Sequence, residues 1–390
     1  MRRKKLWKQA GLALAVSLLL AGCSGQQKEM AEGELPEKTE EVQAETGDAE
    51  KPEQKTETSE MAKTPDLHDY DFTCAFAGDI NLADDWNTME FYGQQENGIY
   101  DCIDPQLIHE MQQADLTCVN LEFCLSDRGA PMAGKKYTFR AKPERAEILK
   151  ELGVDLANLA NNHIYDYGTD AFLDTLSILD ENGIAHAGAG TDAAEAEEPF
   201  YTEIDGRTVA VVSATRAEKY ILTPEAEEET PGVFRCYDMT KVLQKVREAK
   251  ERADIVIAYI HWGTEYSETL ETAQTEGAKA LVDAGADVVL GAHPHCLQGM
   301  EFYEGKPILY SLGNYWFNEK TLDTVLVKLH FYGNDEEQHT EVQLLPARQE
   351  QHVTRLLTDE QEVSDWRSHM ESMEPGTVQI DEKGIISNAD

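Results

Sequence analysis

Short apolar runs alternate with stretches of helical periodicity along residues 72–331 of this chain. Apolar residues spaced three and four apart predict helices over 169–182, 239–252 and 272–284, and Gly183 and Gly285 are placed to end two of them. Continuous runs of Val, Ile, Leu and Ala predict strands buried on both faces of a sheet. These runs cover 72–77, 116–119, 154–159, 208–214, 255–260, 288–290, 308–310 and 324–331. Strands that alternate with helices are typical of an α/β fold.

Six of the apolar runs are followed at once by Asp, Glu, Asn or His, whereas 208–214 and 324–331 are not. In open α/β sheets the carboxyl ends of the strands form the ligand-binding crevice, so we expect the polar residues to meet at one edge of the sheet. The candidate ligands are Asp79, Glu122, Asn162, His261, His293 and His295. Neighbouring residues expected to shape the site are Asn81, Asn120, Glu265, Tyr266 and Asn314.

Each candidate also has a plain structural interpretation. Asp79 follows Gly78 and could be a turn former, and His261 could be a core histidine bonded to a carbonyl. The segment that holds His293 and His295 could be a polar loop with two exposed imidazoles. We favour a shared site, because the plain interpretations would all have to hold at the same edge.

The candidate ligands are carboxylates, an amide oxygen and imidazoles, a mixture that suits Mn, Fe or Zn. Six ligands exceed the needs of one tetrahedral zinc, so we expect one or two divalent ions, with Glu122 able to bridge two. Asp79 and Glu122 would hold the reacting centre, and His163 is placed to donate a proton to a leaving group. The pattern predicts metal-assisted hydrolysis of an anionic ester or amide.

The first residues predict an export address. Basic residues at 2–8 precede an apolar core at 11–20, which is too short to span a bilayer in the mature protein. The following Leu20-Ala21-Gly22-Cys23 resembles the lipobox of bacterial lipoproteins, so Cys23 is expected to be lipidated and to anchor the chain at the outer face of the cell membrane. The alternative is an ordinary cleaved signal that ends near a cysteine.

The rest of the chain divides by composition. Residues 24–71 are polar and acidic and predict a disordered tether, because they contain almost no large apolar side chain. Residues 72–345 are expected to form the folded domain, and 346–390 a partly ordered C-terminal extension. The six cysteines after Cys23 show no dense disulfide framework.

The formal net charge of −40 comes from 74 acidic against 34 basic residues. This balance argues against nucleic acid as a partner, since nucleic-acid sites need basic surface. One candidate basic patch precedes the third ligand-bearing strand, and its alternative is a solvated loop and helix face. The patch consists of Lys135, Lys136, Arg140, Lys142 and Arg145.

Six motifs, in order, carry a family resemblance: GDINL, VNLE, LANNHIYDYG, HWGTEY, GAHPHCLQ and SLGNYWF. They resemble the CapA-type proteins of poly-γ-glutamate capsule synthesis, a branch of the calcineurin-like metallophosphatases. The resemblance implies a four-layer α-β-β-α sandwich with a dinuclear metal site. It also implies that Asp79, Asn162, His261, His293 and His295 match family ligands, and that His163 matches the proton donor.

Two motifs differ from the phosphatase pattern. Asp79-Ile80-Asn81 stands where the phosphatases have Asp-x-His, and Asn120-Leu121-Glu122 stands where they have Gly-Asp-x-x-Asp. One metal position is therefore expected to lack an imidazole, and the bridging carboxylate is expected to be longer.

Three functions remain open from the sequence. The first is a lipid-anchored hydrolase acting on an anionic ester, amide or polyanionic polymer. The second is a non-catalytic assembly component that works with capsule-synthesis membrane proteins. The third is a receptor module that binds a small anion.

Overall fold

Two β-sheets form the centre of the protein, which the computed structural model describes over residues 69–218 and 222–389. The first sheet has eight strands in the order β18-β17-β16-β1-β2-β5-β6, with β15 paired to β1 off this path, and the second has six in the order β13-β14-β12-β11-β9-β8. The strands of the first sheet are β1 (Tyr70–Ile80), β2 (Leu116–Leu121), β5 (Leu156–Asn158), β6 (Ala185–Ala187), β15 (Asn314–Trp316), β16 (Leu322–Gly333), β17 (Gln338–Glu350) and β18 (Val353–Leu356). Those of the second are β8 (Phe200–Ile204), β9 (Arg207–Thr215), β11 (Ile255–His261), β12 (Val288–Ala292), β13 (Met300–Tyr303) and β14 (Lys306–Leu309).

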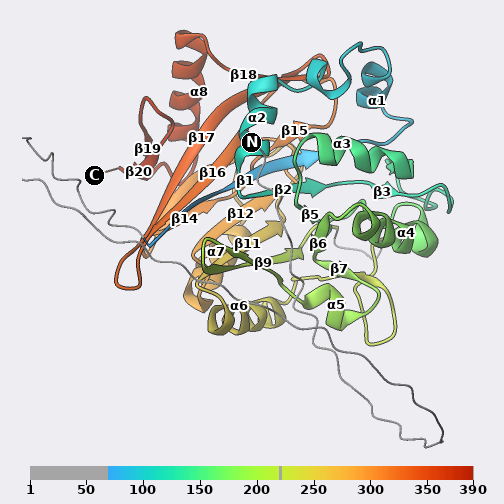
Figure 1. Ribbon diagram of the computed structural model, residues 1–390, viewed down its shortest axis with the longest axis horizontal. Coiled ribbons are helices and arrows are strands. Elements are labelled where there is room, and N and C mark those ends of the chain that lie inside the picture. Colours follow the sequence, from blue (N-terminus) through green and yellow to red (C-terminus); the bar gives the residue numbers. More distant parts are fainter. Residues whose placement is uncertain (1–68, 219–221, 390) are drawn as a thin grey trace, which may run out of the picture. The chain divides into compact units, whose positions relative to one another are not determined.

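Helices cover the outer face of each sheet (Figure 1). Beside the first sheet lie α1 (Asn87–Tyr92), α2 (Pro105–Gln113), α3 (Ala146–Glu151) and α4 (Gly168–Glu181), and beside the second lie α6 (Thr240–Arg252) and α7 (Thr272–Ala284). The remaining helices are α5 (Ala193–Glu197), α8 (Glu360–Ser372) and two short 3-10 helices (Gly98–Asp101 and Pro143–Arg145). Three small strand pairs complete the fold: β3 (Cys124–Leu125) with β4 (Arg140–Ala141), β7 (Ala189–Gly190) with β10 (Gly232–Val233), and β19 (Val378–Ile380) with β20 (Ile386–Asn388).

Three separate apolar cores define four layers. The first core joins the outer face of β1 and β2 to α2, α3 and α4. The second lies between the two sheets, and the third joins β9 and β11 to α6 and α7. The predicted α-β-β-α sandwich is therefore confirmed.

Strand β1 shows how the sequence produces these layers. Phe72, Cys74 and Phe76 point into the core between the sheets, whereas Ala75 and Ala77 face the helices. Successive side chains of a strand point to opposite faces, so one apolar run supplies two cores. Across the central core, the Tyr259 hydroxyl donates to the Ala77 carbonyl at 2.8 Å and ties the two sheets together.

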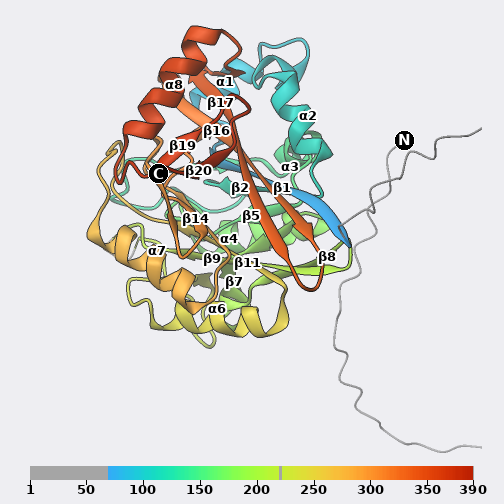
Figure 2. The same cartoon turned by 90° about the vertical axis from the view of Figure 1, so that its left-hand side faces the viewer.

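The C-terminal segment closes one end of the central core. Strand β17 runs across position 345, where the sequence suggested a boundary, and pairs along its length with β16. Trp366 and Met370 of α8 and Ile380 of β19 belong to the core between the sheets. Figure 2 shows α8 beside β16 and β17.

Several sequence-based predictions lie outside the described residues: the export segment 1–23, the lipidation of Cys23 and almost all of the tether 24–71. Within the part of the chain that is described, no helix has the length and apolarity needed to cross a bilayer.

Candidate metal centre

The predicted ligands lie where the carboxyl ends of both sheets meet. Asp79 ends β1, Glu122 follows β2 and Asn162 follows β5, all in the first sheet, whereas His261 ends β11 of the second. The expectation of one edge of one sheet was wrong, because two stacked sheets contribute. The ligands of the two sheets nevertheless meet, since His261 Nε2 lies 3.7 Å from Glu122 Oε1.

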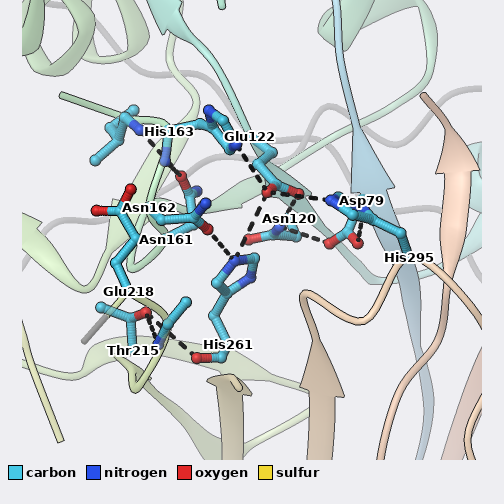
Figure 3. Close-up of polar contacts among 12 residues, drawn as sticks. Asp79, Asn120, Glu122, Asn161, Asn162, His163, Thr215, Glu218, His261 and His295 are labelled. Carbon is cyan, nitrogen blue, oxygen red and sulfur yellow. Dashed lines mark hydrogen bonds and ion pairs between the residues drawn. The ribbon is translucent and has the colours of Figure 1, made fainter. Parts of the chain in front are cut away.

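Glu122 lies at the middle of this cluster (Figure 3). Its side chain is fully buried, and its Oε1 atom lies 3.9 Å from His163 Nε2, 3.7 Å from His261 Nε2 and 3.9 Å from His295 Nε2. These separations are too long for hydrogen bonds, and Oε1 has no hydrogen-bond partner among the described residues. A buried carboxylate oxygen that faces the ring nitrogens of His261 and His295 across such gaps is arranged to share cations with them.

Two groups of side chains could each hold a metal ion, and Glu122 belongs to both. One group is Glu122, His261 and His293, and the other is Asp79, Glu122 and His295. Within each group the candidate ligand atoms lie within 4.8 Å of one another. The geometry therefore suits a dinuclear centre in which Glu122 is the shared ligand.

Burial prepares these groups for a cation. It raises the pKa of the Glu122 carboxyl well above its ordinary value, and the charges of Asp79 and Glu265 raise it further. Burial also lowers the pKa of His261 and of His293 well below the usual imidazole value, as does His295 beside them. The charge of Lys135 offsets only part of this rise, and the imidazoles stay neutral, which is the form that binds metal.

His293 and His295 converge because the backbone turns sharply after β12. Both residues adopt positive φ values, 99° and 57°, which are uncommon for side chains other than glycine. The ring centroid of His293 lies 4.7 Å from that of His261, and His295 Nδ1 bonds to Asn314 Oδ1 at 2.8 Å. Asn314 thus fixes the orientation of one imidazole from outside the cluster.

Glycine at position 78 lets strand β1 approach the backbone of Gly313 closely, next to Asp79 of the site. A Cβ atom there would lie 1.9 Å from the Gly313 carbonyl oxygen, which accepts a hydrogen bond from the Asp79 amide at 3.0 Å. The register of β1 against β2 shifts at this point. Gly78 therefore places the Asp79 carboxylate through a close backbone contact that no other residue allows.

Asn162 and His163 occupy the turn after β5 but face different partners. The Asn162 Oδ1 atom bonds to His261 Nε2 at 2.8 Å, which puts this amide oxygen at the edge of the first group. His163 Nδ1 bonds to Asp166 Oδ2 at 2.7 Å, leaving Nε2 directed toward Glu122. Asn161 accepts hydrogen bonds from the amides of residues 163 and 164, so it shapes the turn.

Lys135 is a buried cation behind this turn and not part of a surface patch. Its ammonium lies 2.7 Å from Asp166 Oδ1 and 3.0 Å from Glu218 Oε1, and it donates to the Asn162 carbonyl. The predicted basic patch therefore does not exist as a unit. Arg145 is also occupied, since it pairs with Asp84 at 2.6 Å.

The residues expected to shape the site differ in position. Asn120 Nδ2 donates to Asp79 Oδ1 at 2.7 Å and contacts Glu122 Oε2 at 3.4 Å, so it spaces the two carboxylates. Asn81 is buried, but its Oδ1 accepts from the Ala83 amide and its Nδ2 has no partner among the described residues. Glu265 and Tyr266 are exposed at the mouth of the site.

Sequence reasoning assigned no role to Asn158, Asp166 or Glu218, and it placed Lys135 in a surface patch. Asn158 donates to Asn120 Oδ1 at 3.0 Å, which holds the amide that separates the two carboxylates. A polar residue within the apolar run predicted over 154–159 is a signal for it. No local pattern points to Glu218, which comes close only through the fold.

The donor set passes a simple test for metal binding. Three buried atoms of the cluster have no hydrogen-bond partner among the described residues: Glu122 Oε1, His261 Nδ1 and His293 Nδ1. Asp79 Oδ2 lies 3.1 Å from His295 Nδ1. Buried polar atoms are seldom left unpaired, so a bound group is needed to satisfy them. Mixed carboxylate and imidazole ligands fit a divalent ion of the Mn, Fe or Zn type.

Comparison with known proteins adds a family context. The sequence profile described as "Bacterial capsule synthesis protein PGA_cap" matches residues 73–319. The PGA biosynthesis protein CapA of Bacillus subtilis is 31% identical over 283 residues, covering 70% of this chain and 72% of that protein. The capsule biosynthesis protein CapA of Bacillus anthracis is 36% identical over 208 residues, covering 52% of this chain and 50% of that protein. Among solved structures, a novel phosphatase from Mycoplasma pneumoniae aligns at 13% identity with a TM-score of 0.43, over 72% of this chain and 95% of that one.

Proposed function

Because the chain belongs to the PGA_cap family of bacterial capsule synthesis proteins, we propose that it is a metal-dependent hydrolase that acts on an anionic polymer of the cell envelope. One observation carries the proposal: the Glu122 carboxylate is shared by two buried groups of potential metal ligands. A purely structural core would not keep an unpaired carboxylate between three imidazoles, because its burial costs several kcal/mol, on the order of 2–5, without a compensating partner.

Six side chains would hold or border the ions. His261 and His293 with Glu122 form one position, Asp79 and His295 with Glu122 the other, and Asn162 borders the first. A divalent ion bound there would supply positive charge to polarise a carbonyl or phosphoryl oxygen and to lower the pKa of a water molecule.

The chain itself provides the proton donor. His163 is held by Asp166 through Nδ1, so its Nε2 is the free nitrogen and points into the cluster. The Asp166 bond fixes the tautomer in which Nδ1 carries a proton when the ring is neutral. A second proton on Nε2 would be available to a leaving group, with the Asp166 carboxylate stabilising the charged ring.

The first residues of the sequence support a site of action outside the cytoplasm. The basic flank, the apolar core and Cys23 support a lipid anchor at the outer face of the cell membrane. The polar segment that precedes β1 would then separate the folded part from the lipid surface.

A non-catalytic role in the polymer machinery is the second candidate, and Asn81 favours it. Asn81 cannot supply an imidazole, and its amide oxygen accepts a hydrogen bond from the Ala83 backbone. The second ligand group therefore contains one imidazole only, that of His295. A weakly held second ion would leave a site able to bind anions without hydrolysing them.

Metal content and turnover of the full-length protein in detergent distinguish the two candidates. We expect one to two equivalents of a transition metal by elemental analysis, together with hydrolysis of polyglutamate, of a γ-glutamyl amide or of a phosphoester, that stops on chelation. The His261→Ala variant should lose activity while keeping its far-UV circular dichroism, and Glu265→Gln, a carboxylate change at the mouth, serves as the control. A protein that holds metal but hydrolyses none of these substrates supports the non-catalytic role, and one without metal contradicts both.

A further inference from the structure

Two exposed tyrosines stand at the mouth of the metal centre. Tyr137 and Tyr266 are 47% and 44% exposed, and only one other large apolar side chain of the described chain, Tyr100, is similarly open. The Tyr266 ring lies 5.7 Å from the ring of His295. Large rings are left in water at a cost, so the position of Tyr266 beside a ligand histidine calls for an explanation.

Tyr137 connects to the opposite side of the cluster through an aromatic chain. Its ring lies 6.0 Å from Trp86, Trp86 lies 5.0 Å from Phe139, and Phe139 lies 4.5 Å from the His163 ring. The two tyrosines therefore approach the centre from the His163 side and from the His295 side.

A lysine ammonium lies over the ring of each tyrosine. The Lys136 ammonium lies 4.6 Å from the centre of the Tyr137 ring, and the Lys320 ammonium 3.4 Å from the centre of the Tyr266 ring. A cation above an aromatic face is attracted by the ring, so both ammonium groups have preferred positions instead of moving freely in solvent.

Neither lysine is neutralised within the described part of the chain, where no carboxylate forms an ion pair with Lys136 or Lys320. Lys241 and Lys328, by contrast, contact Glu197 and Glu110 at 2.9 and 2.7 Å. In a chain with 74 acidic and 34 basic residues, two unpaired cations beside one site are positions left open for an external anion.

The two lysine–tyrosine pairs are linked to opposite sides of Glu122. Tyr266 lies beside the His295 ring, and Tyr137 reaches the His163 ring through Trp86 and Phe139. The Nε2 atoms of both histidines lie 3.9 Å from Glu122 Oε1. Beside Tyr266 lies an open hollow of about 490 Å³, which Cys296, the neighbour of His295, helps to line.

We propose that Lys136, Tyr137, Tyr266 and Lys320 form a binding rim for a linear polycarboxylate that lies across the metal centre. This inference rests on the proposed function and names the residues that would select its substrate. Single carboxylates match the point charges of lysine, and tyrosine rings can pack against the methylene groups between them. Phosphate recognition commonly uses arginine forks, and the nearby Arg128 and Arg145 are engaged with Asp174 and Asp84.

The test measures binding of a linear polyglutamate of defined length to the full-length protein in detergent, by fluorescence anisotropy at low ionic strength. We expect the double variant Lys136→Glu/Lys320→Glu to bind about tenfold more weakly, because two exposed ion pairs are replaced by repulsion. The control variant Lys245→Glu/Lys383→Glu makes the same change of net charge on α6 and in the β19–β20 hairpin, and it should bind within about twofold of the wild type. Metal content should be unchanged in both variants, since no rim residue belongs to a ligand group.

Three results would overturn the rim. They are equal weakening by the rim and control variants, no effect of the rim variant, and binding of inorganic polyphosphate as tight as that of polyglutamate. A wild-type protein that holds metal and hydrolyses a small ester but binds no polymer would reject the rim and leave the hydrolase standing. Polymer binding that depends on the rim in a protein without metal would support the rim and reject the hydrolase.

Discussion

Replacing Glu122 with glutamine should affect the metal-free and metal-bound protein in opposite directions. The substitution keeps the size of the side chain and removes its charge from a position that is fully buried. Without metal, the Oε1 atom of wild-type Glu122 is buried with no hydrogen-bond partner among the described residues. The variant should therefore be as stable as the wild type in chelator, or more stable by about 1 kcal/mol.

With metal, the wild type should gain stability that the variant cannot. The folded part spans residues 69–389, about 320 residues, so its unfolding entropy is roughly 0.67 kcal/mol/K at ~2.1 cal/mol/K per residue. A ligand at 100 times its Kd adds ~2.7 kcal/mol. The wild-type Tm should then rise by about 4 °C on metal addition. The Glu122→Gln variant should show almost no rise, because both ligand groups contain Glu122.

The pH dependence provides an independent check in chelator. Burial raises the pKa of Glu122 in the folded state above its unfolded value, so the folded protein holds this proton more tightly. The contribution is present at acidic pH and is lost as the pH rises from the ordinary glutamate range through the raised value. The difference in unfolding free energy between wild type and variant should therefore shift in favour of the variant as the pH rises.

Differential scanning calorimetry with and without metal, alongside elemental analysis, measures these quantities. Glu265→Gln is the matched control, because it removes a carboxylate from the mouth that belongs to neither ligand group. It should keep the full rise in Tm. The reasoning fails if Glu122→Gln retains metal and the rise in Tm, or if it is clearly less stable than the wild type in chelator.

Three further predictions address the proton donor, the protonation of the site and its support. His163→Asn should keep the metal and lower turnover by about 10²–10⁴-fold, since a positioned proton donor contributes about this much. Elemental analysis and steady-state kinetics measure the two quantities, and unchanged turnover would show that His163 takes no part in the reaction. Metal binding to the metal-free protein should release protons, because burial raises the pKa of Glu122, and the number released should fall as the pH rises. Calorimetry in buffers of different ionisation enthalpy measures the number of protons released, and no release at any pH would contradict the prediction. Gly78→Ala should lower the unfolding free energy by about 3 kcal/mol or more, because the added Cβ would lie 1.9 Å from the Gly313 carbonyl oxygen. A denaturant titration measures this loss, and a variant as stable as the wild type would show that the contact can relax.

The sequence predicted the strands and helices well where burial produces a strong pattern. The runs at 72–77 and 255–260 lie within β1 and β11, and the helix predicted over 272–284 has the bounds of α7. Continuous apolar runs and helical spacing are local properties, so no knowledge of the fold is needed to recognise them.

The gathering of Asp79, Glu122 and His261 followed from a general rule about strand ends, but their distribution over two sheets did not. Strand order depends on pairings far apart in sequence, and no local pattern encodes that β1 pairs with β16. The burial of Lys135 was missed for the same reason, since its partners Asp166 and Glu218 come from other segments.

The pairing of β1 with β16 has a consequence for how the chain folds. Tyr70 lies opposite Gly333 and Ala77 opposite Leu326, so some 250 residues separate two hydrogen-bonded neighbours in the middle of a sheet. During translation, the first strand to emerge must wait for nearly the whole polypeptide before its edge is covered, and contacts of such range slow folding. An uncovered edge can pair with other chains, so a truncated product that stops near residue 319 would be prone to aggregate.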